Sequence, residues 1–287
     1  MRAVVANRIW RRRTCGDNPA LPCTPLNTML FVLSPAKSLD YETPLKVQTH
    51  SAPLFVKQSQ SLIKVLRAYS PPQISELMDL SDALSGLNVA RYQAWSPRAS
   101  EKNARQALLA FNGDVYDGLN ARALDEDALA WAQAHVCVLS GLYGVLRPLD
   151  LMQPYRLEMG TRLPTEQGAD LYQFWGSRIT DYLNERVQDD AEPVLVNLAS
   201  QEYFKSVKPK LLKARVIECV FEDYKNGVYK IISFNAKRAR GAMMRFAIEQ
   251  RIDKPEQLRD FTGDGYKLAA KVSTPERLVF RRKLAAA

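Results

Sequence analysis

Three short apolar runs stand out along the chain, and each is followed by a polar segment that contains serine. They are Leu30–Leu33, Val136–Leu139 and Val194–Leu198. Apolar runs of this length are typical of interior strands whose two faces are both covered. The pattern therefore predicts three buried strands, each leading into a loop with hydroxyl groups.

Two later apolar runs are joined by a turn sequence, and helical patterns fill most of the remaining chain. Runs 215–221 and 228–234 flank Lys225-Asn226-Gly227, whose Asn-Gly pair favours a tight β-hairpin, and 278–281 adds a candidate edge strand. Apolar spacing predicts helices over 51–69, from Ser70 onward, and over 101–111, 124–134, 168–187 and 236–252, with Ser51 and Ser70 placed to cap the first two. Together these elements predict a mixed α/β (α+β) fold, with a central mixed sheet flanked by helices.

The first 28 residues differ from the rest of the chain. They hold five arginines against one acid, Asp17, and show no periodicity. We interpret them as an extension preceding a natural start at Met29; the alternative is an arm for organelle targeting or nucleic-acid binding. Residues 29–287 are expected to form a single domain, in which 41–130 is a candidate helical subdomain.

Composition narrows the function classes without selecting one. The net charge of +9 falls to +5 without residues 1–28, because 35 basic and 30 acidic residues then remain. Such an excess permits a polyanionic partner without requiring one. Two histidines exclude a multi-histidine metal site, and four cysteines without C-x-x-C spacing favour a reduced, cytoplasmic compartment. No apolar run approaches the ~20 residues that span a bilayer.

The segment from Ile74 to Trp95 has the pattern of a helix-hairpin-helix. Gly86 would let the backbone turn and approach a phosphate, and Asn88 tolerates the left-handed conformation there. Arg91, one turn into the second helix, could add a charge to the same phosphate. The alternative is an ordinary helical corner with a glycine cap.

Two basic clusters lie beside predicted strand ends. One holds Lys205, Lys208 and Lys210, and the other holds Lys237, Arg238 and Arg240. Such clusters are commonly solvated surface, but two of them in comparable positions favour a phosphate-binding groove.

The loops after the three buried strands carry further candidates for that groove. They are Ser34, Lys37 and Ser38, then Ser140, Gly141 and Gly144, then Ser200 and Lys205. Ligands bind beyond the carboxyl ends of parallel strands, so these loops would converge on one cleft if the strands are parallel neighbours. Hydroxyls, glycine amides and ammonium groups suit an anionic backbone.

The irregular segment 139–160 contains two acids. Asp150 and Glu158 could form an acid/base pair; alternatively they pair with Arg147 and Arg156 and hold the shape of the loop. No G-x-S-x-G, Walker or G-x-G-x-x-G motif points to a particular enzyme class.

Five segments together resemble the bacterial YaaA family of peroxide stress resistance proteins: 34–40, 111–119, 139–160, 197–209 and 237–241. The resemblance covers Met29 to about Phe280. It implies a cytoplasmic protein that limits iron and peroxide damage and binds DNA through a helix-hairpin-helix and a positively charged cleft. Carried over by position, the hairpin residues are Gly86, Asn88 and Arg91. No catalytic residue or cofactor is established for the family, so the resemblance transfers none.

Three hypotheses about function remain open at this stage. The first is a monomeric protein that binds DNA phosphates without reading sequence and limits oxidative damage. The second is an enzyme that acts on a nucleotide or on damaged nucleic acid in the strand-end cleft, with Asp150 or Glu158 as the acid. The third is direct sequestration of iron, with carboxylates as the ligands.

Overall fold

The computed structural model describes residues 29–283. The predicted extension at residues 1–28 lies outside the described residues.

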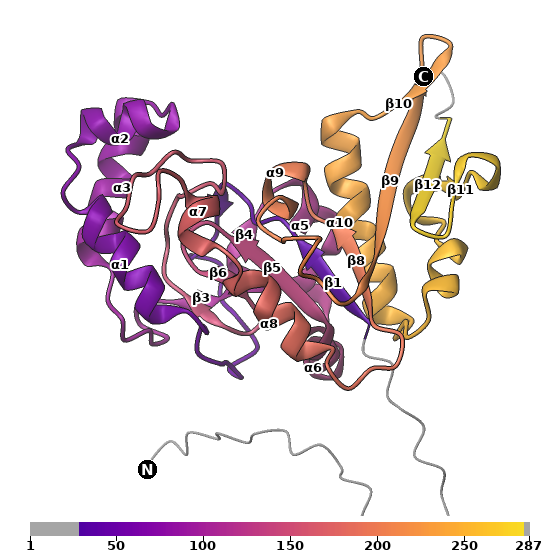
Figure 1. The fold of residues 1–287 in the computed structure, drawn as a ribbon, viewed down its shortest axis with the longest axis horizontal. Coiled ribbons are helices and arrows are strands. Elements are labelled where there is room, and N and C mark those ends of the chain that lie inside the picture. Colours follow the sequence, from indigo (N-terminus) through magenta and orange to yellow (C-terminus); the bar gives the residue numbers. More distant parts are fainter. Residues whose placement is uncertain (1–28, 284–287) are drawn as a thin grey trace, which may run out of the picture.

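A mixed eight-stranded sheet forms the centre of the molecule (Figure 1). Its order is β11-β12-β9-β8-β1-β5-β6, with β10 paired to β9. The strands are β1 (Leu30–Leu33), β5 (Val136–Ser140), β6 (Gly144–Leu146), β8 (Val194–Leu198), β9 (Arg215–Lys225), β10 (Val228–Lys230), β11 (Lys267–Leu268) and β12 (Arg277–Arg282). The predicted fold class, a mixed sheet flanked by helices, is confirmed.

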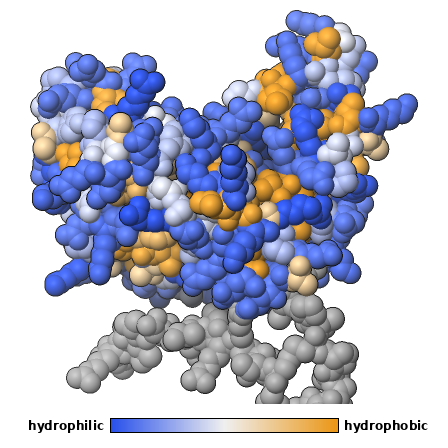
Figure 2. Space-filling model, viewed as in Figure 1, coloured by the Kyte–Doolittle hydropathy of each residue, from blue (hydrophilic) through white to orange (hydrophobic). Residues whose placement is uncertain are grey.

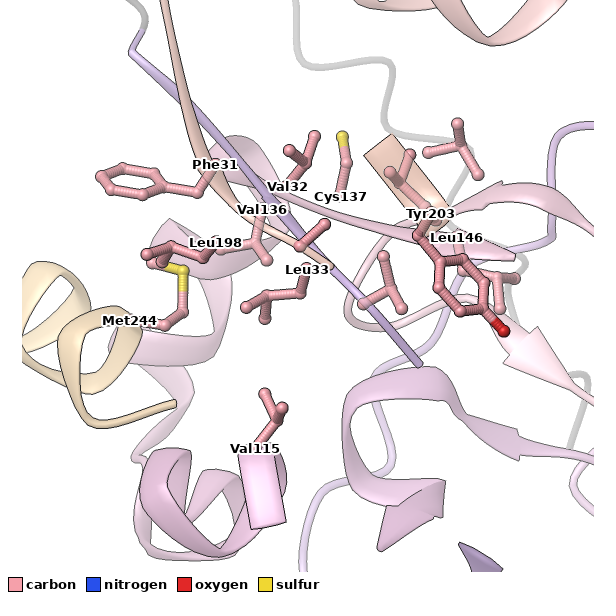
Figure 3. Close-up of a cluster of buried hydrophobic side chains, with 14 of the residues drawn as sticks. Phe31, Val32, Leu33, Val115, Val136, Cys137, Leu146, Leu198, Tyr203 and Met244 are labelled. Carbon is pink, nitrogen blue, oxygen red and sulfur yellow. The ribbon is translucent and has the colours of Figure 1, made fainter. Parts of the chain in front are cut away.

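The three predicted interior strands are parallel neighbours. β1 lies between β5 and β8, with Val32 opposite Cys137 on one side and Asn197 on the other. All four residues of β1 are buried, because helices cover both faces of the sheet at this point. Figure 3 shows side chains of β1 packed with Met244 and Val115 from two helices. The carboxyl ends of the three strands therefore meet at one edge.

Helices surround the sheet on both faces. They are α1 (Val56–Leu66), α2 (Pro71–Met78), α3 (Asp82–Ala94), α4 (Ala107–Ala110), α5 (Asp114–Leu119), α6 (Glu126–His135), α7 (Leu171–Trp175), α8 (Arg178–Arg186), α9 (Gln201–Phe204) and α10 (Ser233–Glu249), with 3₁₀ turns η1 (Ala121–Ala123), η2 (Pro255–Asp260), η3 (Gly263–Gly265) and η4 (Ala270–Val272). Two short ribbons pair β2 (Ser38–Leu39) with β4 (Phe111–Asn112) and β3 (Arg105–Gln106) with β7 (Leu151–Met152). In Figure 1, α1, α2 and α3 form a lobe at one end of the sheet, which we call the helical lobe. The subdomain over 41–130 stays a prediction.

At the other end the β9–β10 hairpin projects beyond the sheet (Figure 1). Asn226 and Gly227 turn the chain with φ of 56° and 84°, as an Asn-Gly hairpin requires. We call residues 224–234 the arm. The predicted hairpin is confirmed, although β10 ends at Lys230 and the chain enters α10 at Ser233.

Two predicted helices are shorter than expected. The helix predicted over 51–69 begins only at Val56, because Ser51 does not cap it and instead donates a 2.7 Å hydrogen bond to Asp150. The helix predicted over 101–111 is reduced to α4, because residues at both of its ends pair in the short ribbons.

The helix predicted over 168–187 is two helices, α7 and α8. Gly176 separates them with a φ of 54°, a conformation outside the helical region. The helices predicted near 124–134 and 236–252 are confirmed as α6 and α10. Asp125 caps α6 by accepting a 2.7 Å hydrogen bond from the Ala128 amide. Within residues 29–283, no helix is long and apolar enough to cross a membrane.

Candidate functional site

The predicted convergence of strand-end loops is confirmed for β1 and β8. Ser34 follows β1, and its Oγ accepts a 2.8 Å hydrogen bond from the amide of Ser200, which follows β8. The two hydroxyl oxygens lie 3.3 Å apart, and Ser200 caps α9. The two loops therefore form one continuous edge.

The hydroxyl at the end of β5 is turned into the protein. Ser140 is fully buried, lies 2.6 Å from the hydroxyl of Tyr155 and accepts a hydrogen bond from the Tyr143 amide. Burial raises the pKa of Tyr155 well above its usual value, so this phenol is neutral at physiological pH. Ser140 therefore holds segment 139–160 in place and does not line a cleft, contrary to the prediction.

Glu158 joins two cations at this edge. One carboxylate oxygen lies 2.8 Å from the ammonium of Lys37, and the other lies 3.1 Å from the guanidinium of Arg156. This carboxylate is committed to an ion-pair network, as the alternative interpretation of the sequence proposed. The Nε of Arg156 is buried and has no hydrogen-bond partner among the described residues.

Arg91 brings a further positive charge from the helical lobe. Burial lowers the pKa of its guanidinium, and the nearby charge of Arg156 acts in the same direction. The hydroxyl of Tyr92 donates a hydrogen bond to the carbonyl of Arg156, which fixes α3 against this segment. Like charges held close together are stabilised by an anion between them.

Lys205 directly follows α9, a helix that packs on segment 156–160. Its ammonium is exposed and lies 4.7 Å from the ring centroid of Tyr172. The carboxylate of Glu202, in α9, accepts a 2.9 Å hydrogen bond from the amide of Gly160, so α9 packs directly on this segment. We call Lys37, Arg91, Arg156 and Lys205 the basic cluster; its acids are Glu158 and Glu202.

Lys237, in α10, lies near the loop that follows β1. Its ammonium is 3.9 Å from Asp114, at the start of α5, and a Cβ at the preceding Gly113 would lie 3.6 Å from Ala36. The exposed Ser38 belongs to the same β1 loop. Lys37 with Ser38, Arg91, Lys205 and Lys237 come from four separate parts of the sequence, and their grouping into one binding site stays a prediction.

The other predicted cations contact different elements. The amide of Lys208 donates to Thr180 in α8, so Lys208 and the nearby Lys210 follow a connection tied to that helix. Arg238 pairs with Asp264 at 3.3 Å, and Arg240 lies between α10 and β9 near Glu218. These contacts do not join Lys208, Lys210, Arg238 and Arg240 to the basic cluster, and the single groove predicted for both clusters stays a prediction. Proximity in the sequence on a helix or connection does not decide which face a side chain takes.

The turn predicted at Gly86 is also in the wrong place. Gly86 and Asn88 both lie inside α3, and the amide of Asn88 donates to the carbonyl of Leu84 within the same helix. The turn between α2 and α3 is made instead by Asp79, with a φ of 51°. Asp tolerates this left-handed conformation, so no glycine is needed.

Replacing Gly86 with alanine tests this assignment. A Cβ at Gly86 has no atom within 4 Å, and the position is helical. We therefore expect Gly86→Ala to raise the free energy of unfolding by about 1 kcal/mol, because alanine loses less conformational entropy in a helix. Urea denaturation measures the change. A loss of stability would mean that the residue adopts a turn conformation.

Asp150 serves a structural role. Its carboxylate is fully buried and accepts hydrogen bonds from Ser51 at 2.7 Å and from the guanidinium of Arg147 at 2.8 Å. It offers no proton to an exposed surface, so the acid/base pair with Glu158 considered from the sequence is not formed. Among residues 29–283, no group of three or more His, Cys, Asp or Glu side chains is arranged to hold a metal ion.

The comparisons with known proteins decide the family. The family model described as "Peroxide stress protein YaaA" matches residues 29–272. The chain belongs to the YaaA family. A UPF0246 protein of Albidiferax ferrireducens is 64% identical over 255 residues, which are 89% of this chain and 98% of that protein. One of Paracidovorax citrulli is 66% identical over 256 residues, 89% of this chain and 99% of that protein.

One residue of this YaaA-family chain was not selected as a ligand contact from the sequence. Arg156 was considered only as a partner for Glu158, yet its guanidinium and the ammonium of Lys37 share that carboxylate. It lies in a segment without periodicity, so its direction could not be derived from spacing. The available signal was chemical: the irregular loop contains two arginines and two acids, so each arginine has an acid nearby in the sequence with which it can pair.

Proposed function

We propose that this protein acts in the peroxide stress response by holding DNA through its phosphates, without reading the base sequence. The binding surface is the hollow between the helical lobe and the arm, which Figure 2 shows on one side of the molecule. Segment 156–160 and α9 lie between these two projections, and they carry or adjoin the basic cluster.

The observation that carries this proposal is the network in which the carboxylate of Glu158 contacts both Lys37 and Arg156, so that two cations from separate segments are held at one place. Arg156 contacts Glu158 through one nitrogen, and its Nε has no partner among the described residues, so this guanidinium has donors left for an anion. Four cations against two acids leave the cluster with a net positive charge. Phosphate oxygens accept charge-assisted hydrogen bonds from such groups, and these contacts carry no sequence information.

The proposed role in peroxide stress is that bound protein covers the DNA and keeps oxidants away from it. Protein bound along the backbone shields the sugar–phosphate from oxidants generated by iron and peroxide, and this is the route that we propose for limiting damage. It requires abundant, non-specific binding, which electrostatic contacts to phosphates supply.

The test is fluorescence anisotropy with a labelled duplex of random sequence, titrated at several salt concentrations. Lys37→Gln and Arg156→Gln are each expected to weaken binding about tenfold at low salt, since one charge-assisted contact is lost. Each should also reduce the slope of log K against log salt by about 1. Lys210→Gln removes an equal charge beside α8 and is the matched control, with unchanged affinity.

Two results would contradict the proposal. Binding of the wild-type protein that ignores salt would exclude phosphate contacts as its source. An equal loss of affinity in Lys210→Gln and Lys37→Gln would place the DNA outside the hollow. Lys37 is largely exposed, with 66% of its side chain accessible, so its variant reports on binding even if Arg156→Gln folds poorly.

A further inference from the structure

The arm exposes a concentration of large apolar side chains. Five of the ten such side chains exposed among the described residues lie within these eleven positions: Tyr224, Val228, Tyr229, Ile231 and Phe234. Phe234 is 60% exposed and Ile231 is 55% exposed. Single exposed apolar residues are ordinary, but a group of this size marks a contact surface. Figure 2 shows apolar colour over the hairpin and at the start of α10, beside the hollow.

The charges on the arm itself have one sign. From Tyr224 to Ile248 the sequence contains six cations and no Asp or Glu. The cations of α10 have acids beside them, as in the ion pairs of Lys237 with Asp114, Arg238 with Asp264 and Arg245 with Glu249. The other two, Lys225 and Lys230, lie on the arm. The two acids that precede the arm, Glu222 and Asp223, are paired with Arg281 and Arg282 of β12. Lys225 and Lys230, on the arm itself, therefore give this surface a positive charge that favours an anionic occupant.

Cations also stack on the aromatic rings of the arm. The guanidinium of Arg281 lies 4.5 Å from the ring centroid of Tyr229, and the ammonium of Lys283 lies 4.9 Å from that of Tyr224. These two rings meet edge to face across the hairpin, with centroids 5.1 Å apart. Flat apolar faces interleaved with cations are the arrangement that accommodates bases and phosphates together.

A second copy of the chain fits this surface poorly. Two arms in contact would bring Lys225 and Lys230 of each copy together, with no free acid in the arm to compensate. A nucleic acid supplies both complements, since its bases have apolar faces and its phosphates are anionic. The arm lies beside the hollow, so it is continuous with the surface proposed for the phosphates.

We propose that the arm contacts the bases of bound DNA, with Phe234 and Ile231 placed against a base step and partly unstacking it. This inference rests on the proposed function, because the phosphates must be held in the hollow for the arm to reach the bases. Apolar side chains that enter a base step unstack it and bend the duplex. The basic cluster would then supply salt-dependent affinity, and the arm would supply a distortion that salt does not remove.

The test uses the full chain and a 20-base-pair duplex with 2-aminopurine, a fluorescent adenine analogue, at its centre. Emission of this base rises when it is unstacked, so it reports on the arm, while anisotropy of the same duplex reports on binding. At saturating protein we expect the wild type to raise the emission, and Phe234→Ala and Ile231→Ala to abolish most of that rise. Their affinity should fall about tenfold with an unchanged salt slope, because no phosphate contact is lost.

Leu211→Ala is the matched control. Leu211 is 52% exposed but lies on the connection between α9 and β9, beside α8. It should retain the full rise in emission. Salt-dependent binding without a rise in emission, or with an equal rise in Phe234→Ala, would overturn the arm contact and leave the proposed function standing. No binding to the duplex at all would overturn both.

If the arm binds another protein chain instead of DNA, the same variant gives a different result. If Phe234→Ala changed the sedimentation coefficient of the free protein and left the emission unchanged, the arm would be an interface between copies of the chain, and the base contact would be wrong.

Discussion

Gly241→Ala is expected to lower the free energy of unfolding by about 3 kcal/mol, one of the two largest effects of a single substitution that we foresee in this protein. A Cβ at Gly241 would lie 1.7 Å from the carbonyl oxygen of Val115, and one at Gly118 would lie 2.1 Å from the carbonyl oxygen of Arg238. The backbones of α5 and α10 therefore touch through two glycines. An added methyl group must push the helices apart, and that separates packed side chains on both.

Urea denaturation followed by circular dichroism measures this loss. Gly86→Ala is the matched control, because the same substitution at an uncrowded helical glycine is expected to have the opposite sign. A Gly241→Ala variant as stable as the wild type would mean that α5 and α10 can separate at little cost. The contact between these helices also positions Asp114, the partner of Lys237, so affinity for DNA should be measured on the same samples.

The elements that could be predicted from the sequence are those whose signal is local. β1, β5 and β8 were found because each is an apolar run buried on both faces, and the hairpin because Asn226 and Gly227 both need positive φ. Elements whose ends are fixed by distant partners were misplaced. Residues 101–106 form no helix because Arg105 and Gln106 pair with β7, more than 40 positions away.

The same distinction holds for the candidate site. Lys37 and Lys205 could be predicted to lie near one another, because parallel strands bring their carboxyl ends to one edge. Arg240 could not be excluded from the sequence, since only the packing of α10 on β9 decides that it lies near Glu218. Gly86 was misread because the left-handed turn was assigned to a glycine when Asp79 makes it.

Two features of the sequence already indicate the arm as a contact surface. The hairpin was predicted, and an interval of 25 residues without an acid was visible in the sequence. What the sequence does not show is exposure: Ile231 and Phe234 read equally well as a strand continuing into the core. Their exposed fractions follow from β10 ending at Lys230, which leaves both side chains outside the sheet.

Asp150→Asn is expected to lower the free energy of unfolding by about 3 kcal/mol, because it leaves the guanidinium of Arg147 without its counter-charge. Asp150 accepts hydrogen bonds from the amide of Arg147, from its guanidinium and from Ser51, and it is fully buried. An asparagine of the same shape presents an amide group where these donors need an acceptor. Its substitution therefore also loosens the junction between segment 139–160 and the residues that precede α1.

Glu158→Gln provides the control for that substitution and separates the two acids of the loop. The side chain of Glu158 is 22% exposed and sits between Lys37 and Arg156, so its loss is expected to cost less than about 1 kcal/mol. Affinity for DNA should move the other way and increase, since the basic cluster loses one of its two acids. Thermal denaturation and the anisotropy assay measure both effects. An Asp150→Asn variant that unfolds like the wild type would return this carboxyl to the list of candidates for chemistry, because a buried acid without a structural role is one whose protonation a site can use.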